Sequence, residues 1–195
     1  MSEERRDVVV VGGGPAGSAV ACLLAHRGHD VLLLDSARFP RDKVCGEGVS
    51  PEAWRLLDAM GAAGRVRDLA PHPLRGMRLV SPDGTSFRGE YRGRERPGFA
   101  VRRLALDAAL LDAARHAGVE VREGVRVTGL VREGEGTAGA VAERGGERRE
   151  CRARVTVGAD GRRSVVARSL GLLREHPRMR RFAVRGYWEG VEALG

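Results

Sequence analysis

The chain has 195 residues and a formal net charge of +8, and hydrophobic residues make up 42% of it. This length is enough for one ordinary domain or one and a half small ones. Aromatic residues contribute only 4%, so the core must be built from Ala, Val and Leu. Nearly all the positive charge is arginine, since Lys43 is the sole lysine, and no basic run is interleaved with aromatic residues. We therefore expect no nucleic-acid partner.

The cysteines and the start of the chain indicate the cellular compartment. Cys22, Cys45 and Cys151 lie far apart with no C-x-x-C pair, which predicts neither a disulfide framework nor a metal site. The first residues are polar, and the apolar run Val8–Val11 is too short for a signal peptide or a membrane span. These features predict a cytoplasmic protein and leave open an association with a membrane surface.

The beginning of the chain predicts a βαβ unit. Val8–Val11 is a short apolar run, typical of a strand buried on both faces of a parallel sheet. The turn Gly12–Gly17 follows with the sequence G-G-G-P-A-G, and a helix is expected over Ser18–Arg27. Val31–Leu34 is a second buried strand that leads directly into Asp35. Strand, glycine turn, helix, strand and acid stand in the order of a Rossmann-like dinucleotide-binding unit.

Each position in this unit has a physical reason. Gly12 permits the tight turn, Gly14 lets the backbone approach a pyrophosphate, and Gly17 lets the helix pack closely on the sheet. The helix N-terminus offers free N–H groups to the phosphates. The Asp35 carboxylate accepts hydrogen bonds from ribose hydroxyls and would repel a 2′-phosphate. FAD or NAD therefore fits this site, and NADP does not.

Periodicity and turn residues predict the rest of the chain. In chain order, we expect a loop over 36–50, a helix from Ser50 to Met60, strands over Gly76–Val80 and Thr85–Gly89, a helix over Leu104–Ala117, strands over Val119–Val121, Val125–Val131, Ala138–Ala142, Arg148–Cys151 and Val155–Val157, a short helix over Ser164–Leu170 and a half-buried strand over Phe182–Trp188.

Several motifs carry a family likeness from end to end of the chain. The chain resembles the flavin-dependent monooxygenase and reductase superfamily that includes para-hydroxybenzoate hydroxylase, and within it the geranylgeranyl reductase family. The Lys43-x-Cys45-Gly46 loop is the specific feature, because aromatic hydroxylases usually lack that cysteine. The motifs are Val8–Gly17 with Asp35, the loop Pro40–Pro51, Arg103-x-x-x-Asp107, Ala159-Asp160-Gly161 with Ser164 and Arg168, and Phe182–Trp188.

The resemblance implies roles for individual residues. Asp160 and Gly161 would lie beside the flavin and hold its pyrophosphate or ribityl region, and Arg103 would face the FAD phosphates from a helix start. Cys45 and Gly46 would lie near the flavin ring at the substrate pocket, as the catalytic positions. The cofactor-binding positions are then Gly12, Gly14, Pro15, Ala16, Gly17, Asp35, Ser36, Arg41, Lys43, Arg103, Val127, Asp160 and Gly161.

Each of these positions also has a simpler interpretation. Asp160-Gly161 could be only a turn after a strand, and Arg103 one more solvated arginine. Arg41 and Lys43 could belong to an ordinary charged loop, and Cys45 could be a small buried residue without chemistry.

The predicted fold class is α/β, with a Rossmann-like FAD-binding domain and the beginning of a second, mainly β substrate domain. The family's third flavin motif, a Gly-Asp dipeptide ahead of a helix, does not occur in the chain. We therefore expect the N-terminal portion of a longer enzyme whose C-terminal portion is missing. The FAD-binding domain is expected over two separate segments, 1–75 and 99–175, with substrate-domain strands over 76–98 and the start of a substrate-binding sheet over 176–195.

Three functions remain open at this point. The first is an NAD(P)H-dependent reductase that saturates isoprenoid double bonds with FAD, acting on a prenyl lipid or another small molecule. The second is an FAD-dependent aromatic or polyketide hydroxylase, with which the chain shares Asp35 and Asp160-Gly161 equally well. The third is a truncated fragment without activity of its own. A halogenase is disfavoured because the chain has no lysine-containing Trp motif of that kind.

Overall fold

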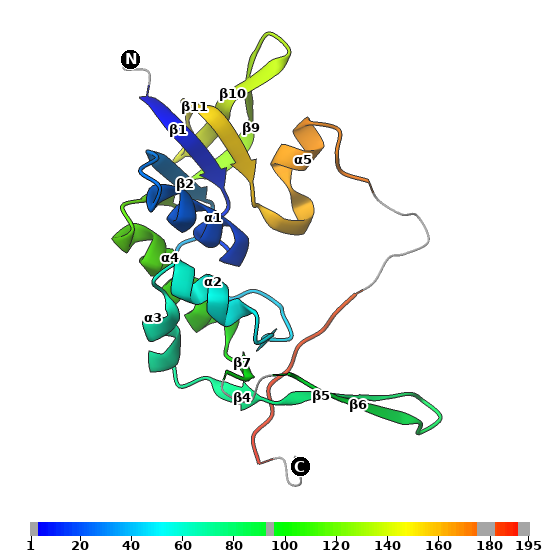
Figure 1. The fold of residues 1–195 in the computed structure, drawn as a ribbon. Coiled ribbons are helices and arrows are strands. Elements are labelled where there is room, and N and C mark those ends of the chain that lie inside the picture. The colour runs from blue at the N-terminus through cyan, green and yellow to red at the C-terminus, as the bar shows by residue number, and fades with distance from the viewer. Residues whose placement is uncertain (1–3, 93–95, 175–181, 191–195) are drawn as a thin grey trace.

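The computed structural model describes residues 4–92, 96–174 and 182–190. Within these ranges the main sheet has six strands, in the order β8-β2-β1-β11-β10-β9 (Figure 1). The strands β8, β2, β1 and β11 are parallel, and β10 and β9 continue the sheet in the antiparallel sense. The bounds are Glu4–Val11 for β1, Val31–Asp35 for β2, Glu120–Glu123 for β8, Arg126–Glu133 for β9, Gly136–Arg144 for β10 and Glu147–Gly158 for β11.

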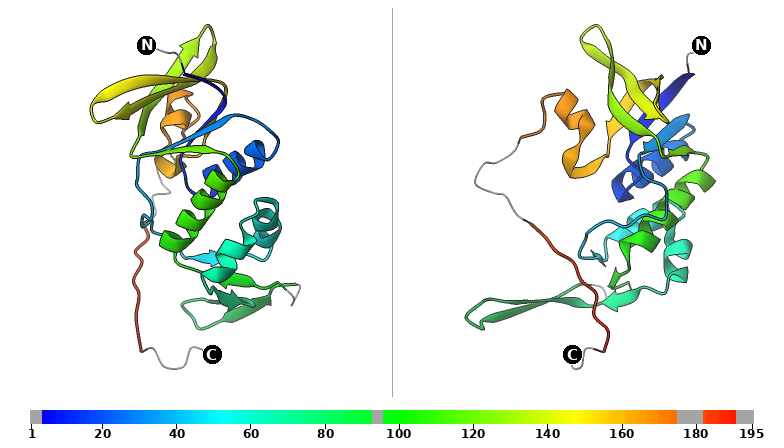
Figure 2. Two further views of the ribbon diagram at one scale, coloured as in Figure 1. Left: turned by 90° about the vertical axis from the view of Figure 1, so that its left-hand side faces the viewer. Right: turned by 180° about the vertical axis from the view of Figure 1, so that it is seen from behind.

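Helices cover one face of the parallel strands. Alternate residues of β1 explain the two layers: Val8 and Val10 belong to the cluster that contains the helices, and Val9 and Val11 belong to the cluster on the other face. The antiparallel strands curl over that second face together with the short helix α5, as the two views of Figure 2 show. The helix bounds are Pro15–Ala25 for α1, Ala53–Ala59 for α2, Ala63–Asp68 for α3, Arg103–His116 for α4 and Val165–Ser169 for α5, which a 3₁₀ turn over Gly161–Arg163 precedes.

Two smaller sheets extend from the helical side. One has the strand order β3-β7-β4, and the other is the hairpin β5-β6, which projects from the body of the molecule (Figure 1). On the hairpin, Met77, Leu79 and Phe87 are all more than half exposed, and Leu79 and Phe87 are direct cross-strand partners. The hairpin therefore presents an apolar stripe to solvent. The bounds are Gly48–Val49 for β3, His72–Leu74 for β4, Gly76–Val80 for β5, Ser86–Glu90 for β6 and Gly98–Ala100 for β7.

Two glycines let the turn after β1 pack against the end of β11. Gly12 has φ +103°, and a Cβ there would lie 2.5 Å from the Ala159 carbonyl oxygen. A Cβ on Gly17 would lie 1.7 Å from the Gly12 carbonyl oxygen. No side chain fits at either position, so backbone packing alone requires both glycines.

Most of the predicted elements are confirmed. The differences occur where contacts between residues far apart in the sequence determine the bounds of an element or its existence. The separate strands expected at Arg148–Cys151 and Val155–Val157 are one strand, β11, because β10 pairs with residues 147–152 and β1 pairs with residues 151–158, so the two pairings overlap at Cys151 and Arg152. The helix expected to begin at Ser50 begins at Ala53, with Glu52 at the N-cap. The helix α3 and the short strands β3, β4 and β7 were not predicted.

The strand expected over Phe182–Trp188 is wrong for the described structure. These residues have no regular secondary structure, and Phe182 and Val184 are 95% and 98% exposed. An alternating pattern becomes a strand only where a neighbouring strand pairs with it, and no strand in the described ranges does so. Of the segment 176–195, residues 176–181 and 191–195 lie outside the described residues. None of the described helices is long and apolar enough to cross a membrane.

The Gly17 packing makes a testable prediction about stability. Gly17→Ala forces a Cβ into the Gly12 carbonyl, so we expect a loss of at least about 3 kcal/mol in the free energy of unfolding, measured by urea denaturation followed by circular dichroism. The matched control is Gly64→Ala in α3, where a Cβ would meet nothing within 4 Å. It should raise stability by about 0.5–1 kcal/mol. Equal effects of the two substitutions would contradict the packing described here.

Candidate functional site

The residues predicted to bind a dinucleotide come together at the carboxyl edge of the parallel strands. Val11, at the end of β1, pairs with Leu34 on one side and with Gly158 on the other. The glycine turn, Asp35 and Asp160-Gly161 each follow or end one of these three strands. Because the ends of parallel strands meet at one edge, the three segments form a common cradle there.

The N-terminus of α1 opens into this cradle. Gly14 is the N-cap residue, Pro15 occupies the first turn, and no side chain caps the helix. Ala16 is exposed on the same turn. A Cβ on Gly14 would meet only the Arg41 Nη2 atom, at 3.5 Å. Protein packing therefore does not demand glycine at this position, and the space that it leaves lies beside unpaired helix N–H groups suited to an anion.

Asp35 joins the second strand to the glycine turn. Its Oδ2 atom accepts a hydrogen bond of 2.6 Å from the Gly13 N–H, and its Oδ1 atom accepts one of 2.7 Å from the Ala37 N–H. A carboxylate has four lone pairs, so these bonds leave acceptor capacity for ribose hydroxyls. Ser36 follows with an exposed side chain. Asp35 thus has a structural task that the sequence did not reveal, in addition to its predicted place at the ribose.

The loop after β2 brings two cations to the cradle. The Arg41 side chain is 15% exposed, and its Nη2 atom lies next to the space in front of Gly14. The Lys43 Nζ atom lies 3.3 Å from the position that a Cβ of Gly161 would occupy. One cation therefore stands at the glycine turn and the other at the turn after β11. This arrangement provides positive charge along the path of a pyrophosphate.

A buried carboxylate orients the arginines. The Asp107 side chain on α4 is fully buried and binds the Arg103 guanidinium through two hydrogen bonds, of 2.6 Å and 2.8 Å. Its Oδ2 atom also lies 2.8 Å from the Arg41 Nη1 atom. The Nη1 atom is buried, and this contact is an ion pair whose geometry is not that of a hydrogen bond. The structure thus places both Arg103 and Arg41 against Asp107, and the Arg41 Nη2 atom also reaches Gly14.

Cys45 lies beside Arg103 and differs from the other two cysteines. The Glu47 N–H donates to its Sγ atom at 3.5 Å, and this bond lowers the pKa of the thiol; partial burial opposes the shift and the Arg103 guanidinium reinforces it. Cys22 and Cys151 are buried, and burial raises the pKa of the Cys22 thiol. Gly46, next to Cys45, is exposed, and a Cβ there would meet nothing within 4 Å. Cys45 is therefore the cysteine suited to proton or thiolate chemistry.

Asp160 holds the start of α5. Its Oδ1 atom accepts a hydrogen bond of 2.5 Å from the Ser164 hydroxyl, and its Oδ2 atom accepts one of 2.6 Å from the Val165 N–H. Gly161 follows with φ +79° and lies near Lys43. The local geometry is that of a turn after a strand, as the simpler interpretation has it. The turn nevertheless lies beside Lys43 and so forms part of the cradle. Val127 is buried in the core cluster on the far face of the sheet.

The sequence did not predict the contacts that hold the loop after β2, over residues 36–50. Glu47, Asp42 and Arg185 form a network with one another, and Asp107 was recognised only within a motif. Asp107 had one local indication of pairing, its spacing of four residues from Arg103 on a helix. The partners of Glu47 are 56 and 138 residues away, and no local pattern reveals contacts of that kind.

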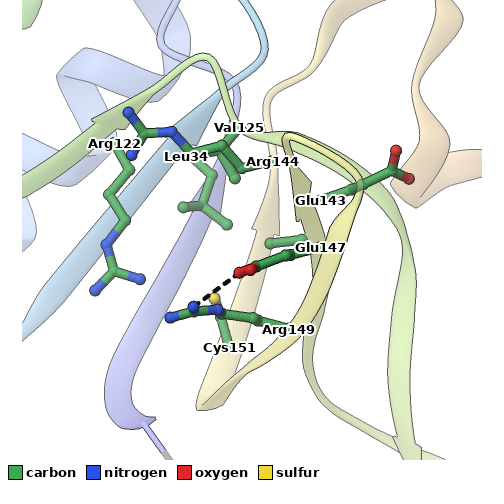
Figure 3. A pocket seen from close by; sticks show the side chains of 9 residues that line it. Leu34, Arg122, Val125, Glu143, Arg144, Glu147, Arg149 and Cys151 are labelled. Carbon is green, nitrogen blue, oxygen red and sulfur yellow. Dashed lines mark hydrogen bonds and ion pairs between the residues drawn. The ribbon is translucent and has the colours of Figure 1, made fainter.

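A concavity of about 320 Å³ lies away from the cradle, between the end of β2, β8 and the hairpin of β10 and β11 (Figure 3). Leu34, Val125 and Cys151 contribute its apolar lining. Its rim carries charges of both signs, among them the ion pair of Glu147 with Arg149. It contains none of the glycine-turn, Arg41 or Asp160 positions, so the cradle remains the candidate site.

Comparison with known proteins agrees with this geometry. The profile of the FAD binding domain family matches residues 5–186. The chain is 36% identical over 187 residues to the menaquinone reductase of Mycobacterium tuberculosis, covering 95% of this chain and 45% of the relative. It is 38% identical to the digeranylgeranylglycerophospholipid reductase of Methanosarcina acetivorans, covering 85% of this chain and 40% of the relative. The chain thus spans less than half the length of these relatives.

Other relatives are named for other reactions. The 6-methylpretetramide 4-monooxygenase of Streptomyces rimosus is 35% identical over 85% of this chain and 41% of its own. Among solved structures, the myxobacterial chondrochloren halogenase CndH has a TM-score of 0.79 at 30% identity, with 85% of this chain and 39% of that chain covered. A geranylgeranyl bacteriochlorophyll reductase-like protein from Thermoplasma acidophilum has a TM-score of 0.74 at 28% identity, covering 87% and 42%. The likeness to geranylgeranyl reductases is confirmed, as is the α/β fold.

The open position at Gly14 separates binding from folding. Gly14→Val should abolish FAD binding, because the side chain would fill the space in front of the α1 N-terminus. It should cost at most about 1 kcal/mol of stability, since no protein group except Arg41 is near. Bound flavin absorbance and the melting temperature of the flavin-free protein would be measured together. Unchanged flavin content would remove Gly14 from the cofactor site.

The buried carboxylate makes a second prediction. Asp107→Asn leaves two arginines facing a neutral amide, so the free energy of unfolding should fall by about 3–5 kcal/mol. Asp112→Asn is the matched control, because Asp112 lies on the same helix and pairs with Arg65 but is 47% exposed. Its loss should cost less than about 1 kcal/mol. Similar urea midpoints for the two variants would show that Asp107 does not organise the loop.

Proposed function

The chain belongs to the FAD binding domain family, and on that premise we propose that it forms the cofactor-binding portion of a reductase that saturates isoprenoid double bonds, with NAD(P)H as the electron donor. The observation that carries this proposal is the placement of Cys45, whose thiol pKa is lowered, on the loop that brings Arg41 and Lys43 to the cradle. The resemblance to geranylgeranyl reductases rests on this same loop.

The residues present fit FAD. Arg41, whose Nη2 atom lies at the open position in front of Gly14, would hold the pyrophosphate together with the N-terminus of α1. Asp35 would accept from the ribose, and Lys43 and Gly161 would lie at the other end of the cradle. When bound, FAD supplies hydride transfer between a nicotinamide and the substrate.

The proposed role of Cys45 follows from what an isolated alkene needs. Such a bond is unactivated, so its reduction depends on positioning and on a proton for the second carbon. The Cys45 Sγ atom is half-buried and polarised by the Glu47 N–H and Arg103. We assign it to the wall of the substrate pocket as the group that holds this proton, and not as a covalent nucleophile. Gly46 leaves the adjacent space open to the substrate.

We propose a prenyl-lipid substrate taken from a membrane surface by a cytoplasmic, peripherally bound protein. Two relatives are named for lipid substrates. The stripe formed by Met77, Leu79 and Phe87 is an exposed apolar surface of the kind that contacts a bilayer or a partner.

A flavin-dependent hydroxylase is the second candidate function. The relative from Streptomyces rimosus is a monooxygenase with almost the same identity as the reductases. The glycine turn, Asp35 and Asp160-Gly161 would serve either chemistry, so the cradle itself does not discriminate. Cys45 favours the reductase.

The test compares two products of one reaction mixture. The purified protein, or any longer product of the same gene, would be loaded with FAD and given NAD(P)H, a geranylgeranyl lipid and an aromatic polyketide, without oxygen and then with it. The reductase predicts gain of two hydrogens per double bond under anaerobic conditions, detected by mass spectrometry, and Cys45→Ser should lower that turnover at least tenfold with FAD retained. Oxygen-dependent hydroxylation of an aromatic substrate, with no alkene reduced, would instead establish the second candidate.

A further inference from the structure

Glu47 occupies an unusual backbone position. Its φ is +59°, in the left-handed region that favours glycine, although Gly46 and Gly48 stand on either side of it. A residue with a Cβ is held there only when its surroundings over-determine the conformation. The side chain of Glu47 is 12% exposed, so the surroundings are close packed.

Polar groups from three segments converge on Glu47. Its N–H donates to the Cys45 Sγ atom, and its carbonyl accepts from the Val101 N–H at 3.2 Å. Its Oε1 atom accepts from the Arg103 N–H at 2.9 Å, the first residue of α4. The same Oε1 atom accepts from the Arg185 guanidinium at 3.2 Å and from the Tyr187 hydroxyl at 2.8 Å.

The segment 182–190 reaches Glu47 from far along the chain. It runs in an extended conformation along one side of the molecule, the far side in Figure 1 and the near side in the right-hand view of Figure 2. Arg185 is 16% exposed on this otherwise exposed segment, because it binds both Asp42 carboxylate oxygens, at 2.8 Å and 2.6 Å, and the Lys43 carbonyl at 3.1 Å. Its guanidinium also lies 4.8 Å from the centre of the Tyr187 ring. Arg185 and Tyr187 therefore fasten the segment to the loop that carries Cys45.

We propose that Glu47 is a positioning residue that fixes the Cys45 thiol against the N-terminus of α4, and that Arg185 and Tyr187 make this positioning depend on the seating of residues 182–190. The inference rests on the proposed function only in the role it gives to Cys45. Its test measures the thiol and not catalysis, so its failure would leave the reductase proposal standing.

Charge alone predicts the opposite effect from positioning. The charged groups around Cys45 are Arg103 and Asp107 on α4, Arg41, Asp42, Lys43 and Glu47 on the loop, and Arg185 on the segment 182–190. Removing the negative Glu47 carboxylate would by electrostatics alone lower the pKa of the thiol. Releasing the loop would separate Sγ from the Glu47 N–H and from Arg103, and the pKa would rise. The direction of the shift therefore identifies the role.

The experiment follows alkylation of Cys45 by iodoacetamide from pH 5 to pH 10, using the 195-residue chain with and without FAD. Cys22 and Cys151 are buried, so labelling of the folded protein reports Cys45. Glu47→Gly keeps the N–H, relieves the backbone and removes the carboxylate. We expect its labelling midpoint to rise by about one pH unit, with a rate about tenfold lower below the midpoint. Glu47→Gln, which retains an acceptor, should restore most of the original profile.

Arg185 supplies the test of coupling. Arg185→Gln should raise the midpoint in the same direction, and the double variant with Glu47→Gly should show no further shift, because both act through one contact. Arg149→Gln is the matched control, since it removes the same charge from an arginine that is 77% exposed on the β10-β11 hairpin. Circular dichroism would verify the fold of each variant. An unchanged or lowered midpoint in Glu47→Gly, or an Arg185→Gln profile equal to that of the control, would overturn the proposal.

Discussion

The buried Asp107 carboxylate is the constraint on which the arrangement of α4, the loop over residues 36–50 and the cradle depends. A carboxylate without solvent is destabilising unless cations satisfy it, and here Arg103 and Arg41 both do so. Each arginine also makes a second contact. Arg41 lies at the glycine turn, and Arg103 lies beside the Cys45 thiol. One carboxylate therefore fixes how α4 and the loop over residues 36–50 lie relative to the cradle. The elements that would meet a nucleotide and those that would meet a substrate share this anchor.

The glycine turn separates folding from binding in the same small region. Gly12 and Gly17 are required by contacts of the protein with itself, at 2.5 Å and 1.7 Å from carbonyl oxygens. Gly14 has no such contact, so its glycine serves what enters the cradle and not the packing of the chain. The motif thus combines two residues that build the turn with one that leaves it open. This division assigns the stability of the turn to Gly12 and Gly17 and the access of a ligand to Gly14.

The sequence predicted those elements of the structure that local pattern determines. The βαβ unit followed from Val8–Val11, the glycine turn and Val31–Asp35, because strand, turn and helix are encoded over short distances. The network around Glu47 could not be predicted, since its partners stand at Arg103 and Arg185. The strand expected over Phe182–Trp188 failed for a related reason. Its alternation is real, with Arg185 directed to the loop and Val184 to solvent, but alternation does not supply a pairing strand.

The residues that would distinguish a reductase from a hydroxylase are expected outside the nucleotide cradle. The cradle alone does not separate the two chemistries, since reductases, a monooxygenase and a halogenase each resemble the chain over 85% of its length or more. What differs must lie where the cofactor wall meets the substrate side. On the proposed function, that junction is the loop from Asp42 to Glu47, which holds the polarised thiol and receives Arg185 from the segment 182–190. If the proposed function holds, a substrate that displaces or tightens this segment would act on Cys45 through Glu47, because Arg185 and Tyr187 already contact the Glu47 carboxylate.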